Sequence, residues 1–242
     1  MENISNYKLE KFQEGFLFLV DKPLNWSSFQ AVNAIKWGLK KKFNIKKIKI
    51  GHAGTLDPLA SGLLLICCGK MTKQIADFQG QAKTYTGTIR VGASTPSFDL
   101  ETEIDQHYNI AHISEELIVE TKKQFTGVIR QRPPLFSALK KEGKRLYEHA
   151  RAGNQIEIPE REIEIHLFDI ESIQNKEKYI DLNFKIKCSK GTYIRSIAHD
   201  FGKALHSGAH LSSLRRTAIG TYDVNQALSP ENIKNLLEST RT

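Results

Sequence analysis

The alternation of apolar and polar residues along the chain predicts several β-strands. Residues 15–20 and 63–68 are short, continuous apolar runs, which are typical of strands buried on both faces. Residues 85–91 alternate between apolar and polar positions. Residues 163–167 and 180–188 alternate in the same way on either side of a polar turn. This last pair predicts an antiparallel hairpin with one buried face.

Other segments carry the spacing of amphipathic helices. Apolar residues fall on one helical face between residues 32 and 43, directly after Ser27 and Ser28, which can cap a helix. Ser114 is expected to begin a second helix that stops before Gly127, and residues 194–205 predict a third. Because strands and helices mix without a regular βαβ period, the sequence predicts an α+β fold.

Composition narrows the class of protein. The chain has 242 residues and a formal net charge of +8, with 40% hydrophobic residues, which is an ordinary globular composition. No apolar run reaches the roughly 18 residues of a membrane span, so no membrane partner is expected. Three cysteines without a metal or disulfide spacing indicate a reducing, cytoplasmic setting. The basic balance favours nucleic acid as a partner.

The positive charge is concentrated in three segments. Residues 36–49 contain seven lysines and no acid, and residues 140–151 and 187–216 are also rich in Lys and Arg. A single lysine run is usually a solvated face. Three such runs can also converge on one groove that follows a nucleic-acid backbone.

The most unusual segment is the glycine-rich stretch 51–62, which reads GHAGTLDPLASG and contains His52 and Asp57. From the residues alone, a tight turn in which Asp57 caps backbone N–H groups is favoured over a reactive carboxylate. The sequence does not match other catalytic or metal-binding motifs. A P-loop would need glycine at Leu64, no G-x-S-x-G elbow is present, and the eight histidines form no metal-binding spacing.

Five further stretches accompany this one. They are VDKPLNWSS (20–28), KTY (83–85), PLFSALK with GKRLYEHAR (134–140 and 143–151), CSKGTYIR (188–195) and GAHLSSLRR (208–216). Together with residues 51–62 they resemble, in order, the motifs of the TruB-type tRNA pseudouridine synthases. The resemblance runs from about residue 15 to about residue 224.

The resemblance implies a pseudouridine synthase fold, with a mixed, mainly antiparallel sheet flanked by helices and loops. It implies conversion of uridine 55 in the TΨC loop of tRNA to pseudouridine by a monomer that needs no cofactor or metal. Asp57 matches the catalytic aspartate, Arg195 the arginine paired with it, and Tyr85 the tyrosine that stacks on the target base. The target uridine must be flipped out of its loop.

The family also suggests residues that bind the substrate. His52 would occupy the place of the flipped nucleotides, while Thr95 and Asp99 would contact them. Tyr193 and Leu214 would line the uracil pocket, and Lys22 belongs to a motif that supports the active-site loop. Lysines 40–49 and a thumb loop at about residues 132–159 would hold RNA phosphates, the latter through Lys140, Lys144 and Arg145.

Some features depart from the family pattern or leave alternatives open. Asn25 replaces a usual glycine, and Pro96 and Phe98 replace polar residues. The match ends near the C-terminus, so one catalytic domain over residues 1–242 is expected, without a PUA-type domain. The alternatives are a non-catalytic tRNA-binding or chaperone protein, a guide-RNA enzyme that shares the Thr-Leu-Asp-Pro core, and a hydrolase with paired carboxylates.

Overall fold

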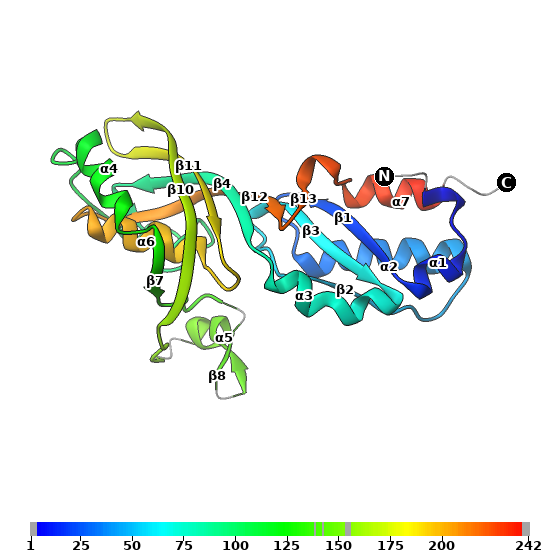
Figure 1. Ribbon diagram of the computed structural model, residues 1–242. Helices are drawn as coiled ribbons and strands as arrows, with labels where there is room; N and C mark the ends of the chain where they lie inside the picture. The colour runs from blue at the N-terminus through cyan, green and yellow to red at the C-terminus, as the bar shows by residue number, and fades with distance from the viewer. Residues whose placement is uncertain (1–3, 138, 142, 153–155, 239–242) are drawn as a thin grey trace. The chain divides into compact units, whose positions relative to one another are not determined.

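A computed structural model describes residues 4–137, 139–141, 143–152 and 156–238. The chain forms two compact units. Unit 1 comprises residues 1–85 and 215–242, and unit 2 comprises residues 86–214. The strand order is β1-β3-β12-β4-β11-β10-β7, and the boundaries between the units fall inside β4 (Lys83–Val91) and β12 (Ala209–Ile219). This mixed sheet with flanking helices confirms the predicted α+β class (Figure 1).

Unit 1 is built on two antiparallel strands. β1 (Phe16–Lys22) pairs with β3 (Ala60–Cys68) along its whole length, and β2 (Ile50–His52) pairs with the last residues of β3. The unit's remaining elements are η1 (Ile4–Asn6), α1 (Leu9–Glu14), α2 (Ser28–Phe43), η2 (Gly69–Gln74), α3 (Ile75–Gly80), β13 (Tyr222–Asp223), η3 (Val224–Gln226) and α7 (Pro230–Glu238).

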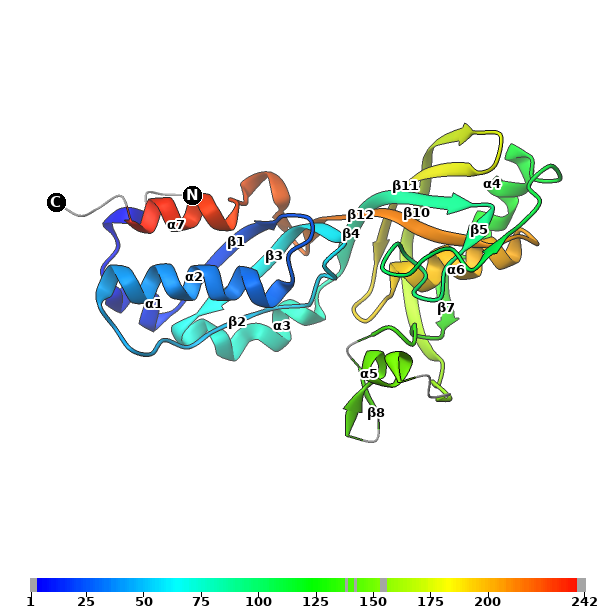
Figure 2. The same ribbon diagram turned by 180° about the vertical axis from the view of Figure 1, so that it is seen from behind.

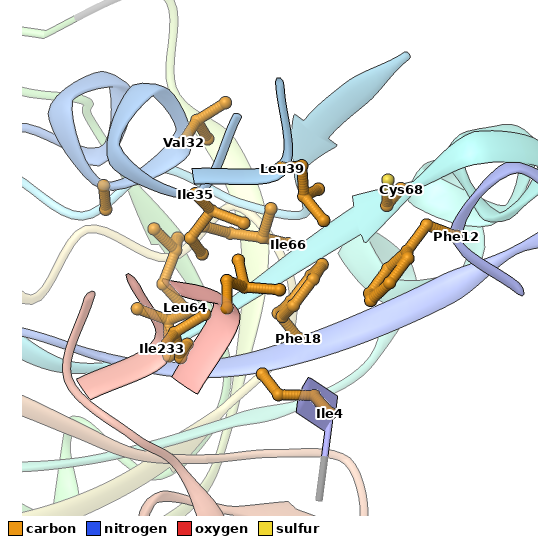
Figure 3. Packing of buried hydrophobic residues seen from close by; sticks show 13 residues of the cluster. Ile4, Phe12, Phe18, Val32, Ile35, Leu39, Leu64, Ile66, Cys68 and Ile233 are labelled. Atoms are coloured by element: carbon orange, nitrogen blue, oxygen red, sulfur yellow. The ribbon is translucent and has the colours of Figure 1, made fainter. Parts of the chain in front are cut away.

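The apolar run in β3 is buried on both faces, which explains why it does not alternate. Leu64, Ile66 and Cys68 pack with α2 and α7, as Figure 3 shows for this cluster. The intervening residues, Leu63 and Leu65 among them, pack with α3 on the other face. Each face of the strand is therefore covered by helix, and every position along it favours an apolar side chain.

Helix α2 has the predicted cap and the predicted buried face. The Ser27 side chain accepts from the backbone N–H of Gln30, and the Gln30 side chain accepts in return from the Ser27 backbone. This capping box fixes the start of the helix. The helix ends at Phe43, and its C-cap residue Asn44 adopts a left-handed conformation with φ 51°.

Unit 2 contains the predicted hairpin. β10 (Arg161–Asn175) pairs antiparallel with β11 (Ile180–Cys188), and β7 (Gly127–Gln131) pairs with the other edge of β10. β10 is longer than its alternating segment and contains register shifts. The other elements are β5 (Ala93–Ser94), β6 (Gln106–His107), α4 (Glu115–Lys123), β8 (Lys140–Lys141), β9 (Lys144–Arg145), α5 (Leu146–Arg151) and α6 (Ile194–Ala204), seen from behind in Figure 2.

Helices α4 and α6 confirm the other two helix predictions. Ser114 caps α4 by accepting from the N–H of Leu117, and the helix ends at Lys123, before Gly127, which begins β7 with φ 86°. Phe201 of α6 packs against Phe168 of β10, with ring centroids 5.7 Å apart. Within the described residues, no helix combines the length and apolar character needed to cross a bilayer.

Candidate active site

Asp57 lies half-buried in the loop that joins β2 to β3 in unit 1. Arg216 of β12 holds the backbone of this loop and is only 1% exposed. Its guanidinium donates to the carbonyl oxygens of Leu63 at 2.7 Å and Gly54 at 3.1 Å, with a longer contact to Thr55 at 3.4 Å. A charged planar donor that reaches several carbonyls fixes the loop on both sides of Asp57.

Gly62 makes the close approach of β12 possible. A Cβ atom at this position would lie 2.3 Å from the carbonyl oxygen of Arg216 and 2.8 Å from its backbone nitrogen. The residue also has φ +104°, which L-residues rarely adopt. Glycine is therefore required here for packing as well as for backbone conformation.

The segment after β1 contacts the same loop. The Ser28 hydroxyl donates to the Leu56 carbonyl at 3.0 Å and accepts from the Leu56 N–H at 2.8 Å. The Asn25 N–H donates to the Pro58 carbonyl at 2.8 Å. These bonds hold the residues immediately before and after Asp57. Asn25 has φ 64°, so it adopts the left-handed conformation that glycine favours and asparagine tolerates.

Lys22 is fully buried and supports its own turn. Its Nζ donates to the carbonyls of Pro23 at 2.9 Å and Trp26 at 2.5 Å. Burial lowers the pKa of Lys22 to about 8, the negative charge of Asp57 partly offsets this effect, and the charge of Arg216 adds to it. Lys22 and Asp57 therefore lie close enough to interact electrostatically.

His52 and Tyr85 also belong to unit 1. Burial lowers the pKa of His52, and the charge of Arg216 lowers it further, so its ring is neutral at pH 7. A neutral ring is suited to stacking on a base. Tyr85 is 8% exposed in β4, where it follows the buried Lys83 at the alternating spacing of a strand. Its predicted contact with the target base stays a prediction.

Two of the predicted residues of unit 2, Thr95 and Asp99, lie beside Arg195 in the first turn of α6. The Arg195 side chain is buried and donates to the carbonyls of Ser97 at 3.1 Å and Phe136 at 2.9 Å. Its Nε lies 3.5 Å from an Oδ of Asp99. Thr95 donates to the Asp99 carbonyl at 2.6 Å. Thr95, Asp99 and Arg195 therefore form one buried cluster, whereas the predicted pair of Asp57 and Arg195 joins two units and stays a prediction.

Phe98 in the same loop replaces a polar residue of the family pattern. It has φ 64° and stacks on His199 of α6 with ring centroids 3.7 Å apart. A bulky residue in the left-handed region costs free energy, which this stacking offsets in part. Burial lowers the pKa of His199 to about 4, with a smaller contribution from Lys203.

Tyr193 and Leu214 are both half-buried in unit 2. The Gln131 side chain donates to the Tyr193 carbonyl at 3.0 Å and accepts from its N–H at 2.8 Å. The guanidinium of Arg161 lies 4.9 Å from the centre of the Tyr193 ring. The backbone of Tyr193 is therefore well fixed, while its predicted role and that of Leu214 stay predictions.

The thumb segment contains a two-stranded turn and a helix. Lys140 and Lys141 of β8 pair with Lys144 and Arg145 of β9, and α5 follows directly. The side chains of Lys144 and Arg145 are exposed. The backbone of Lys140 belongs to β8, but its side chain lies outside the described residues.

Three contacts of the site were not predicted from sequence, namely those of Arg216, Ser28 and Gln131. Arg216 lay in a recognised motif without an assigned role. The adjacent Arg215 instead pairs with Asp21 at the surface. The two arginines are neighbours in the same motif, and the sequence alone does not show which of them is buried. Among the described residues, no group of three or more His, Cys, Asp or Glu side chains is placed to hold a metal ion.

Family models identify the class of protein. The model of the TruB family pseudouridylate synthase N-terminal domain matches residues 40–194, and that of the tRNA pseudouridylate synthase B C-terminal domain matches residues 195–242. Both describe pseudouridylate synthases, a class of isomerases. More narrowly, the chain belongs to the TruB family.

Relatives agree with this assignment. The chain is 62% identical to tRNA pseudouridine synthase B of Flavobacterium johnsoniae over 90% of its own length and 94% of the relative's. It is 48% identical to the protein of that name in Parabacteroides distasonis, over 94% and 95% of the two chains.

A solved structure shares the fold. A chain in the crystal structure of a Cbf5-Nop10-Gar1 complex matches with TM-score 0.66 and 29% identity. The match covers 92% of the present chain but only 54% of that chain, so the present chain spans about half its length.

Proposed function

We propose that the chain converts the uridine at position 55 in the TΨC loop of tRNA to pseudouridine. The observation that carries this proposal is the loop of Asp57, whose backbone is held by Arg216, Ser28 and Asn25. A reactive side chain must be held accurately in place for catalysis. The hydrogen bonds to the backbone of this loop restrict the position of the Asp57 carboxylate. The names of the relatives support tRNA as the substrate.

In the proposed reaction the enzyme flips the uridine out and Asp57 acts on it. The glycosidic bond between N1 and C1′ breaks, the base turns, and a bond forms between C5 and C1′. C5 then loses its proton and N1 gains one, so the atoms balance without a co-reactant. Asp57 acts either as the nucleophile or as the base that removes a ribose proton.

The other residues have supporting roles in this proposal. Tyr85 stacks on the base, and Arg195, oriented by its bonds to Ser97 and Phe136, is the proposed partner of the carboxylate. His52, Tyr193 and Leu214 shape the space around the flipped nucleotide. The protein acts as a monomer in the cytoplasm in this proposal, with tRNA as its partner.

The test is pseudouridine formation in a TΨC-loop transcript. Wild-type protein is expected to produce one pseudouridine per transcript at position 55, whereas Asp57→Ala and the near-isosteric Asp57→Asn are expected to produce none while they still bind. A transcript with cytidine at position 55 is the matched control and should contain no pseudouridine. Binding without any product by wild-type protein would favour a non-catalytic tRNA-binding protein instead.

A further inference from the structure

The side chain of Gln131 forms two hydrogen bonds to the backbone of a single residue, Tyr193. Gln131 is the last residue of β7 and is only 1% exposed. Its amide oxygen accepts from the Tyr193 N–H at 2.8 Å, and its amide nitrogen donates to the Tyr193 carbonyl at 3.0 Å. An amide group offers a donor and an acceptor in one plane, so it matches a backbone N–H and C=O at the same time. The pairing therefore fixes the Tyr193 backbone in position and in orientation.

Tyr193 lies at the beginning of α6 as its N-cap residue. The usual N-cap residues are Ser, Thr, Asp and Asn, which bond to backbone N–H groups through their own side chains, and tyrosine is not among them. The Tyr193 carbonyl accepts the first bond of the helix, from the Ile197 N–H at 3.2 Å, and accepts from Gln131 as well. Gln131 thus joins the end of β7 to the beginning of α6, which lies 62 residues later in the chain.

The ring of Tyr193 is contacted from the same pair of strands. Arg161 of β10 is the cross-strand partner of Gln131. Its guanidinium lies 4.9 Å from the centre of the Tyr193 ring and donates to the Gly191 carbonyl. Directly opposite residues of an antiparallel pair point to the same face of the sheet. Gln131 therefore holds the backbone of Tyr193, while its strand partner contacts the ring.

The thumb segment begins immediately after Gln131, and its first residues are bonded to the same turn of α6. The Ser196 hydroxyl donates to the Arg132 carbonyl at 2.8 Å, and Arg195 donates to the Phe136 carbonyl at 2.9 Å. Gln131 is thus the residue at which the sheet, the thumb segment and the beginning of α6 meet. A displacement of this part of the chain would be passed directly to the first turn of α6.

A buried amide is not needed here to build the sheet. Side chains alternate along β7, with Val128 and Arg130 exposed and Gln131 at a buried position, which in a sheet usually carries an apolar residue. Burying an amide costs free energy unless its polar atoms are bonded. Both polar atoms are bonded, and both bonds end on Tyr193. The chemistry of this side chain therefore serves the position of Tyr193.

We propose that Gln131 is a positioning residue for the uracil pocket and acts on the substrate through Tyr193. This inference rests on the proposed function, in which Tyr193 shapes the space around the flipped nucleotide. Because both of its backbone groups are held, the Cα–Cβ bond of Tyr193 keeps one direction, and its ring meets the base in one orientation. Positioning of this kind affects the rate of the chemical step more than the strength of RNA binding.

The experiment compares two substitutions of Gln131 with matched substitutions of Asn183. Gln131→Met keeps the size of the side chain and removes both bonds, whereas Gln131→Glu keeps the acceptor and replaces the donor. Asn183 of β11 is the control, because its amide also forms two bonds within the sheet, to Thr88 and Ser172 at 2.8 Å each. Asn183→Leu and Asn183→Asp repeat the two changes there. The single-turnover rate and the affinity for tRNA are measured between pH 6 and pH 8, at a temperature at which circular dichroism shows that the variants are folded.

Gln131→Met is expected to lower the single-turnover rate by about tenfold to a hundredfold and the affinity for tRNA by less than about threefold. The carboxyl group introduced by Gln131→Glu is buried, so its pKa lies above the usual range. Its protonated form offers one donor and one acceptor, as glutamine does. Relative to wild type, this variant should therefore recover rate as the pH falls from 8 to 6, whereas both Asn183 variants should follow the wild-type profile. If Gln131→Met does not fold, this pH-dependent recovery decides the question, and its absence would overturn the proposal.

A double substitution separates positioning from a general loss of stability. Gln131→Met added to Tyr193→Ala should slow the reaction no further than Tyr193→Ala alone, because the first residue acts through the second. Additive losses, a wild-type rate for Gln131→Met, or a loss confined to tRNA affinity would overturn the proposal.

Amide hydrogen exchange at Tyr193 gives a readout that requires no turnover. Exchange is expected to be slow in wild-type protein and faster in Gln131→Met, and equal rates would overturn the proposal. Wild-type protein that forms no pseudouridine would refute the proposed function, whatever the exchange at Tyr193. Wild-type activity that survives unchanged in Gln131→Met would refute only the role of Gln131.

Discussion

The substitution Arg216→Lys tests whether one buried guanidinium holds the Asp57 loop. Arg216 is 1% exposed and donates to the carbonyls of Leu63 and Gly54 through separate nitrogen atoms. A lysine would keep the positive charge, but its single ammonium group at the end of a flexible stem cannot reach both carbonyls in the same way. The substitution therefore removes geometry and leaves net charge unchanged.

The expected cost follows from the bonds that are lost. A hydrogen bond to a charged group contributes about 1.5–3 kcal/mol, and the second carbonyl would be left buried without its donor. We therefore expect Arg216→Lys to lower the free energy of unfolding by about 2–3 kcal/mol. For a chain of this size that corresponds to a decrease in Tm of about 4–12 °C.

Arg215→Lys is the matched control. Arg215 makes two hydrogen bonds to Asp21, at 3.0 and 2.7 Å, but their side chains are 40% and 33% exposed. Breaking such a surface pair costs less than about 1 kcal/mol. Thermal unfolding followed by circular dichroism gives the comparison. Equal Tm values for the two variants would refute the role assigned to Arg216.

Activity gives a second readout of the same substitution. If the loop moves by about 1 Å when Gly54 loses its donor, the rate of pseudouridine formation should fall by roughly tenfold to a hundredfold. The rate is measured in single turnover at a temperature at which Arg216→Lys remains folded. A destabilised variant with the wild-type rate would show that Arg216 supports the fold without positioning Asp57.

Three further predictions concern other parts of the two units. Gly62→Ala should cost at least about 2 kcal/mol more than Gly127→Ala, measured by urea unfolding, because both have positive φ but only the Cβ at Gly62 meets backbone atoms; equal costs would contradict the close approach. Ser28→Ala should cost about 1–3 kcal/mol and slow pseudouridine formation, because Ser28 makes two buried bonds to Leu56; an unchanged rate would argue against support of the loop. The pKa of His199 is lowered to about 4 in the folded protein, so as the pH falls below about 6.5 the unfolded chain binds a proton that the folded protein does not. The free energy of unfolding should therefore decrease between pH 6.5 and pH 4. NMR titration of the His199 ring should give a midpoint near 4, and a midpoint near 6.5 would contradict this.

Local sequence patterns predicted those helices and strands whose caps, turns and apolar faces are formed by their own residues. Helix α2 has its own capping box and apolar face, and the β10–β11 hairpin has a short turn and clean alternation in β11. In both cases the sequence signal and the final packing agree, so the prediction was accurate. The loop of Asp57 was also found from the sequence, through its resemblance to a family motif.

β12 and α7 were not predicted. The residues of β12 show little apolar alternation because polar side chains occupy buried positions: His210 and Arg216 are 0% and 1% exposed. The apolar face of α7 rests on only a few residues, such as Ile233 and Leu237, which become buried through contact with α2. Short or irregular patterns of this kind carry little local signal.

The sequence by itself therefore determined which residues are candidates for chemistry and where the lysines are concentrated. Only the tertiary structure decided which of these residues lie next to one another. It distinguished Arg216 from Arg215, joined Arg195 to Asp99, and added Lys70 and Lys73 to the lysines after α2. The physical reason is that charges and hydrogen bonds act across a few ångströms, whereas the residues that make them are separated by tens to more than a hundred positions in the chain.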